Sequence, residues 1–342
     1  MKSASIGPRI DAGYPFAKPQ PFLLYLCASL LLAVACSVPV TALAAMTAAG
    51  VQYPAWKVDG DTRVALAAGD TVVPGDHVVT GKGGKVWLQM EDEALVKLGE
   101  EADFALKRLS VSVGGGEEPA PGGKAATATP TAGAARPPAD AGNGQQTSKI
   151  EGALSVLKGA FRYTSDNTVG GWNRNLQISM ASVATIGIRG TDLWGAVNVS
   201  DAFVVLLEGV IDVQGTEQGD TVRMDTPLQL FQSQSTALTT VSMDKVKALA
   251  PQTELDFGTG VMEPQGPYVI HLASYREQAA AARVADDLSR DGLAARVESA
   301  LVGGEQWFRL TVSGLASLED ARTLQEKAAA AFSFASPWVA PK

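Results

Sequence analysis

Alternating apolar and polar residues predict β structure in the first two thirds of the chain. Short apolar runs are separated by Gly-Asp, Pro-Gly-Asp and Gly-Gly turns, as expected for strands joined by tight connections. In the run KVWLQM at 85–90, every second residue is apolar, which is typical of a half-buried strand. Further runs lie at 63–66, 77–79 and 94–98, and between about 150 and 231. We therefore expect an all-β domain, a sandwich or roll of short strands, within residues 45–250.

A segment without large apolar residues interrupts this domain. Residues 114–148 are rich in Gly, Pro, Ala and Thr, and such a segment cannot bury enough apolar surface to offset the entropy lost on ordering. Strand patterns of the same style flank it, so we expect a disordered insertion within one domain. A short helix is expected at 242–250, followed by a linker at 251–266.

After this linker the pattern changes to strand–helix–strand, twice, in a module that spans 267–342. The helices are expected to begin at Ser274, where Ser-Tyr-Arg-Glu forms a capping box, and at Ser317. Gly292 is expected to end the first helix. This order predicts an α+β fold: a four-stranded antiparallel sheet with both helices on one face. The strands are expected at 268–273, 293–297, 306–312 and 332–339.

Alternation along the first and third of these strands places one set of side chains on the uncovered face of the sheet. An indole, an imidazole, a guanidinium and a hydroxyl on a flat sheet suit sugar rings, which stack on aromatic surfaces and hydrogen-bond at their edges. Two alternatives are a tryptophan that packs under a loop and a sheet face that dimerises. Trp338 is expected to pack at the sheet edge. The candidate site residues are Val269, His271, Trp307, Arg309 and Thr311.

The N-terminal segment has the features of an export signal. Lys2, Arg9 and Lys18 precede the apolar run 22–40 and a stretch of small residues, which predicts a secretory signal over 1–44, cleaved before Ala45. The run is also nearly long enough to remain as a membrane anchor. A third alternative is lipidation, because the Ala-Val-Ala-Cys sequence that ends at Cys36 loosely resembles a lipoprotein cleavage box. All three alternatives place the remainder outside the cytoplasm, with membrane contact only if the segment is retained or lipidated.

Composition excludes several classes of function. The 342 residues are 46% hydrophobic and 19% charged, which is a globular composition long enough for two domains. A net charge of -8 argues against nucleic-acid binding. The two cysteines, Cys27 and Cys36, both precede the predicted domains, and His77 and His271 are the only histidines. We therefore expect no disulfide, no metal site and no cofactor in the mature domains.

Catalytic chemistry is also not indicated. The β domain shows no pair of carboxylates in a pattern typical of glycoside hydrolysis. Glu208 is the best single candidate, and a turn role before Gly209 is favoured for it. His77 is expected to be a surface residue. We therefore expect no catalytic residues and no enzyme activity.

The β domain resembles the FecR family over about 53–235, apart from the insertion. The resemblance implies a structural role for Gly75, Asp76, Gly81, Arg189, Gly190, Thr191, Glu208 and Gly209. Arg189 is expected to satisfy carbonyls or a carboxylate such as that of Asp192 at a tight corner. Three motifs carry the resemblance in order: Pro74-Gly75-Asp76-His77-Val78-Val79-Thr80-Gly81, then Ile186-Gly187-Ile188-Arg189-Gly190-Thr191-Asp192, then Val204-Val205-Leu206-Leu207-Glu208-Gly209-Val210-Ile211.

The C-terminal module resembles the SPOR domain over 267–340. His271 stands where the family usually has glutamine, and Ala273 stands where it has glycine. SPOR domains bind septal peptidoglycan and prefer glycan strands without stem peptides, so the resemblance implies this ligand. The motifs are Tyr268-Val269-Ile270-His271-Leu272-Ala273-Ser274-Tyr275 and Phe308-Arg309-Leu310, leading to Gly314.

These features favour a non-catalytic protein of the bacterial periplasm or cell envelope. The C-terminal module would bind denuded glycan strands, and the FecR-like domain would be an interaction or scaffold unit for envelope partners. An alternative is a membrane-anchored signalling regulator of the FecR type. A peptidoglycan hydrolase is the least favoured reading.

Overall fold

A computed structural model describes residues 44–113, 148–165, 172–181, 184–198, 201–215 and 221–342. Residues 42–342 form one compact unit. The predicted signal and the predicted insertion lie outside the described residues, except for Ala44 and Ser148. Within the described ranges, no helix has the length and hydropathy needed to cross a membrane.

The first eight strands precede the predicted insertion, and β1 begins one residue after Ala45, before which cleavage was predicted. Strand β1 pairs with β4 and β6, β2 pairs with β3 and β5, and β5 pairs with β8, all antiparallel. Met46 and Val51 of β1 are fully buried, so this stretch belongs to the core of the domain. The strands are β1 (Met46–Gln52), β2 (Ala55–Asp59), β3 (Thr62–Ala65), β4 (Thr71–Val72), β5 (His77–Thr80), β6 (Lys85–Gln89), β7 (Leu95–Leu98) and β8 (Asp103–Val113).

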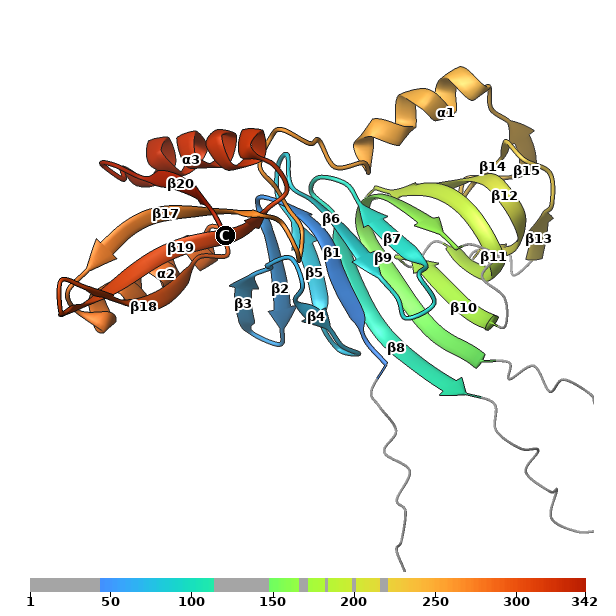
Figure 1. The fold of residues 1–342 in the computed structure, drawn as a ribbon. Helices are drawn as coiled ribbons and strands as arrows, with labels where there is room; N and C mark the ends of the chain where they lie inside the picture. Colours follow the sequence, from blue (N-terminus) through green and yellow to red (C-terminus); the bar gives the residue numbers. More distant parts are fainter. Residues whose placement is uncertain (1–43, 114–147, 166–171, 182–183, 199–200, 216–220) are drawn as a thin grey trace, which may run out of the picture. The chain divides into compact units, whose positions relative to one another are not determined.

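Long strands follow the insertion. The first of them, β9, lies beside β7 and β8 and also pairs with β11 (Figure 1). Strand β9 pairs with β8 and, in parallel, with β10 along its first half; along its second half it pairs with β7 and β11. Strand β12 pairs with β11, β13 and β14, and β14 pairs with β15. The strands are β9 (Ser148–Thr164), β10 (Trp172–Met180), β11 (Ala184–Val197), β12 (Ala202–Gly215), β13 (Thr221–Met224), β14 (Gln229–Gln232) and β15 (Ser235–Thr240).

The prediction of short strands is wrong for three strands of this half, because β9 has 17 residues and β11 and β12 have 14 each. Glycines that suggest turns in the sequence lie inside these strands. Gly159 in β9 has a φ of 96°, and a Cβ there would come within 2.6 Å of the Cα of Ala102. Glycine is therefore required by a close approach of two backbone segments, and not by a turn.

The expected helix at 242–250 is present as α1 (Met243–Leu249), with the hydroxyl of Ser242 accepting from the backbone N–H of Lys245. The segment expected as a linker contains η1 (Ala250–Gln252) and β16 (Val261–Met262). Strand β16 pairs with β1 through Val51 and Gln52, and with β19 (Glu305–Leu315) through Leu315. A backbone ladder therefore runs from the β domain through β16 into the C-terminal module.

Three side chains of the β domain hold the first part of this connection. The ammonium group of Lys85 donates to the carbonyls of Pro251 (2.7 Å) and Glu254 (2.8 Å) and to the carboxylate of Asp256 (2.9 Å). Lys97 donates to both carboxylate oxygens of Glu254, and Arg162 donates to one of them. Charge-assisted hydrogen bonds thus attach this first part of the connection to the β domain.

The C-terminal module has the predicted strand and helix order. Its sheet runs β18–β19–β17–β20, antiparallel throughout. Helix α3 packs against β17 and β20, and α2 packs against β18 and β19. The elements are β17 (Tyr268–Tyr275), α2 (Gln278–Arg290), β18 (Arg296–Val302), β19, α3 (Leu318–Phe332) and β20 (Trp338–Pro341).

Several predicted boundaries in this module are wrong. Ser274 and Tyr275 continue β17, where they pair with Arg309 and Phe308, so the predicted capping box does not start the helix. Helix α2 begins three residues later, after Glu277, which makes no side-chain capping bond. Pairing with a neighbouring strand thus outweighs the local capping signal. Strand β18 lies nearer the C-terminus than expected, and residues 332–337 precede the last strand.

Candidate functional site

The five predicted site residues lie on one face of the C-terminal sheet. Directly opposed residues of antiparallel strands point to the same face. His271 opposes Thr311, Val269 opposes Ser313, and Trp307 and Arg309 precede Thr311 at intervals of two on β19. The buried side chains of Ile270, Leu272, Leu310 and Val312 alternate with them. The structure therefore brings the predicted set together on the face opposite these core residues.

One row of paired residues crosses all four strands at the centre of this face. Thr311 on β19 opposes His271 on β17 and Arg296 on β18, and His271 in turn opposes Trp338 on β20. Arg296 and Trp338 were not among the predicted site residues. The face thus presents an indole, an imidazole, a hydroxyl and a guanidinium in that order.

Exposure separates the groups a ligand can touch from those it cannot. Thr311 and Val269 are only 1% and 9% exposed, so they form the floor of the face. His271, Trp307 and Arg309 are partly exposed. Trp338 lies on the edge strand β20 and packs on the neighbouring strand, as expected, and 49% of its surface remains exposed.

The rings of His271 and Trp338 are stacked, with their centroids 3.8 Å apart and their planes 14° from parallel. Burial, and then the nearby positive charge of Arg309, lower the pKa of His271 below its ordinary value. Its buried Nδ1 has no hydrogen-bond partner in the part of the chain that the structure describes. His271 is therefore a neutral ring at neutral pH, with one polar atom unpaired.

A second group of side chains extends the face along β19. The guanidinium of Arg276 lies 3.7 Å from the centroid of the Trp307 ring and forms an ion pair with Glu305. Arg309 opposes Ser274 on one side and Glu298 on the other. A register shift between His271 and Ala273 brings Ser274 opposite Arg309. Without this shift, alternation would place Ala273 there.

The first FecR-like motif forms a turn that packs on β8. The buried carboxylate of Asp76 accepts from the backbone N–H of Val73 (2.9 Å), and the N–H of Gly75 donates to the carbonyl of Leu106 (2.8 Å). Gly75 has a φ of 106°, and a Cβ on Gly81 would lie 2.8 Å from Pro54. His77, half-buried, lies 3.3 Å from Asp103. These contacts are consistent with a structural role.

The second and third motifs meet where β11 pairs with β12. The side chain of Thr191 is buried and donates to the carbonyl of Val210 (3.3 Å). Gly209 has a φ of 90°, and a Cβ there would lie 2.3 Å from the carbonyl oxygen of Gly190. Glu208 is exposed and opposes Asp192 across the strands. A side chain at position 209 would therefore break this pairing.

Asp192, which was suggested as one possible partner of Arg189, forms an ion pair with Arg162. Arg162 binds the carboxylate of Asp192 with two hydrogen bonds, of 2.9 and 2.7 Å, and this contact raises the pKa of Arg162. Asp192 is therefore already paired with Arg162. The side chain of Arg189 lies outside the described residues.

Comparisons with known proteins agree with the C-terminal resemblance. No curated protein matches the chain. Two crystal structures of a protein assigned as an anti-sigma factor from Parabacteroides distasonis are similar at 11% and 10% identity, with a TM-score of 0.32 in each case. The matches cover 56% and 62% of this chain and 68% and 72% of theirs, and at that TM-score they do not establish a shared fold. The SPOR domain family model matches residues 264–341, so this part of the chain is a SPOR domain.

Proposed function

We propose that this chain is a non-catalytic protein of the bacterial cell envelope that binds peptidoglycan glycan strands through its SPOR sheet. The match of residues 264–341 to the SPOR domain carries the proposal, because SPOR domains bind peptidoglycan. We further propose that the N-terminal segment exports the protein to the periplasm, and that the FecR-like β domain is an interaction unit.

The chemistry of the sheet face supports a glycan ligand. A sugar ring has apolar C–H faces that pack on aromatic rings and hydroxyls that hydrogen-bond at its edge. Trp338, stacked on His271, supplies a partly exposed flat surface. The guanidiniums of Arg296 and Arg309 supply donors beside it. We propose that Trp338, His271 and Arg309 make the main contacts, with Trp307 and Arg296 at the margin.

A sedimentation assay with purified sacculi tests this function. The unit 42–342 is incubated with intact sacculi and with sacculi whose stem peptides have been removed by an amidase. We expect more protein to sediment with the denuded sacculi. Replacing both Trp338 and Arg309 by alanine should weaken binding by at least about tenfold, since hot-spot aromatic and arginine side chains each contribute more than 1 kcal/mol.

A matched variant controls for loss of an exposed aromatic ring. Phe257 is 56% exposed and lies in the connection before β16, away from the sheet face. Phe257→Ala should bind sacculi as the parent does. If the parent protein stays in the supernatant with both preparations, or if the double variant binds unchanged, the proposal is wrong.

A further inference from the structure

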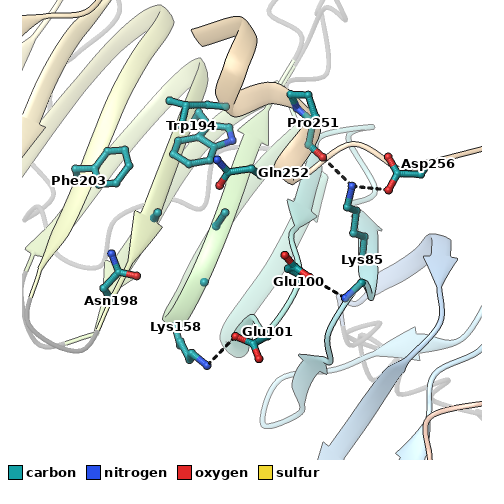
Figure 2. A pocket seen from close by; sticks show the side chains of 15 residues that line it. Lys85, Glu100, Glu101, Lys158, Trp194, Asn198, Phe203, Pro251, Gln252 and Asp256 are labelled. Carbon is teal, nitrogen blue, oxygen red and sulfur yellow. Dashed lines mark hydrogen bonds and ion pairs between the residues drawn. The ribbon is translucent and has the colours of Figure 1, made fainter. Parts of the chain in front are cut away.

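A hollow of about 580 Å³ lies in the β domain, where the connection after α1 crosses β9, β11 and β12 (Figure 2). Its size is within the range of small-molecule sites. Pro251 and Gln252 of the connection border it, and Trp194 and Phe203 lie on the opposite side from Lys85 and Asp256. The hollow is separate from the sheet face of the SPOR domain, because none of its lining residues belongs to 264–341.

Each charged side chain around the hollow already has a partner. Lys158 forms an ion pair with Glu101 (3.7 Å), and Lys85 forms one with Asp256 (2.9 Å). The carboxylate of Glu100 accepts from the backbone N–H of Gly83 (2.8 Å). A charged ligand would therefore have to displace an existing partner, which favours a neutral one.

Three uncharged polar groups remain without partners. The side-chain amides of Asn198 and Gln252 are exposed and make no hydrogen bond within the described ranges. The Nε1 of Trp194 is buried and also has no hydrogen-bond partner there. Two amides and one indole N–H offer both donors and acceptors. The two amides are exposed and the indole N–H is buried, so the amides are the groups that a ligand in the hollow can pair with.

An aromatic surface completes the lining. The ring of Phe203 is partly exposed, and the ring of Trp194 lies beside it, with the two ring centroids 5.5 Å apart. Glu101, one of the lining residues, has a φ of 52°, a backbone conformation that is uncommon for a non-glycine residue. Such outliers persist where surrounding structure supports them, and they are frequent at ligand sites.

We propose that this hollow binds a short neutral saccharide. A saccharide has an apolar face that packs on Phe203 and hydroxyl or acetamido groups that pair with Asn198 and Gln252. It also carries no charge that would compete with the existing ion pairs. This inference does not depend on glycan binding by the SPOR domain, and it assigns the β domain a ligand of its own.

Titration of the unit 42–342 with the trimer of N-acetylglucosamine, followed by calorimetry, tests the inference. We expect saturable binding that Asn198→Ala and Gln252→Ala each weaken about fivefold, as expected for loss of one hydrogen bond. Both side chains are exposed, so these variants should fold as the parent does. Trp338→Ala, on the SPOR face, should leave this binding event unchanged.

Three outcomes would overturn the inference. One is the absence of saturation by the trimer in the Trp338→Ala protein, where the SPOR face is disabled. Another is an affinity for the trimer that is unchanged in the Asn198→Ala/Gln252→Ala double variant. The third is saturable binding of trialanine in place of the trimer, since peptide amides share the same donors and acceptors. Failure of sacculus binding with retention of trimer binding would contradict the proposed function and leave this inference standing.

Discussion

The imidazole of His271 lies flat against the indole of Trp338, 3.8 Å from it, on the exposed face of the SPOR sheet. The two residues come from neighbouring strands and oppose each other in register. One ring titrates and the other does not, so the charge on this aromatic surface changes with pH. Protonation of His271 would therefore change the polarity of the proposed binding face.

Acidification should destabilise the protein through His271. Burial lowers its pKa in the folded state below the ordinary 6.5, so the unfolded chain binds a proton first as the pH falls. The free energy of unfolding should therefore decrease below about pH 6.5 until the folded pKa is passed. Thermal unfolding at pH 7 and pH 5 measures this. His271→Gln should show a smaller decrease; an equal decrease in both proteins would contradict the assignment.

Asp320 should be the most sensitive position in α3. Its carboxylate is fully buried, and one oxygen accepts from the backbone N–H groups of Gly258 (2.7 Å), Gly260 (3.0 Å) and Val261 (2.9 Å). Asp320→Ala leaves these donors unpaired and should lower the free energy of unfolding by about 3 kcal/mol or more. Asp320→Asn keeps an acceptor in place and should cost less. Urea unfolding that ranks the two variants in the reverse order would be inconsistent with this role.

Trp56 should stabilise the end of α2. Its Nε1 lies 3.1 Å from the carbonyl oxygens of Ser289 and Arg290, two of the last residues of that helix. Trp56→Phe keeps most of the packing and should lower the free energy of unfolding by about 1 kcal/mol. Trp56→Ala should cost about 3–5 kcal/mol because it also creates a cavity. Chemical denaturation distinguishes the two, and equal losses would mean that the hydrogen bond contributes little.

Gly209 should not tolerate a side chain. Its φ of 90° and the 2.3 Å approach to the carbonyl of Gly190 predict that Gly209→Ala destabilises the β domain by at least about 3 kcal/mol. Gly60 is a matched control, because its φ is 56° but no atom lies within 4 Å of an added Cβ. Gly60→Ala should cost about 1 kcal/mol. Comparable melting temperatures for the two variants would refute the steric argument.

The SPOR fold was predictable because its signals are local. Alternation on two strands, helix periodicity and Gly292 at the helix end all operate over a few residues, and Gly292 does have the positive φ expected of it. Boundaries were less predictable where local and long-range signals conflict. The Ser274 capping signal gave way to pairing with Arg309, which lies far along the chain.

The candidate face was only partly predictable for the same reason. The positions of His271, Trp307 and Arg309 on this face follow from alternation, which needs only the sequence of the strand that each residue belongs to. The contribution of Trp338 depends on which strand lies beside β17, and pattern alone does not specify a neighbour. The contact of Arg162 with Asp192 likewise joins two strands, whereas the sequence argument considered Asp192 only as one possible partner of the nearby Arg189.

Strand β16 has only two residues, yet its backbone pairs with β1 and with β19. If the SPOR domain is held by the cell wall as proposed, tension on the β domain would pass through these backbone hydrogen bonds. Side chains of both domains also hydrogen-bond to the connection between them: Lys85 and Lys97 from the β domain, and Asp320 from the SPOR domain. A wall-bound copy would therefore resist pulling as a single mechanical element, without a slack tether between wall and β domain.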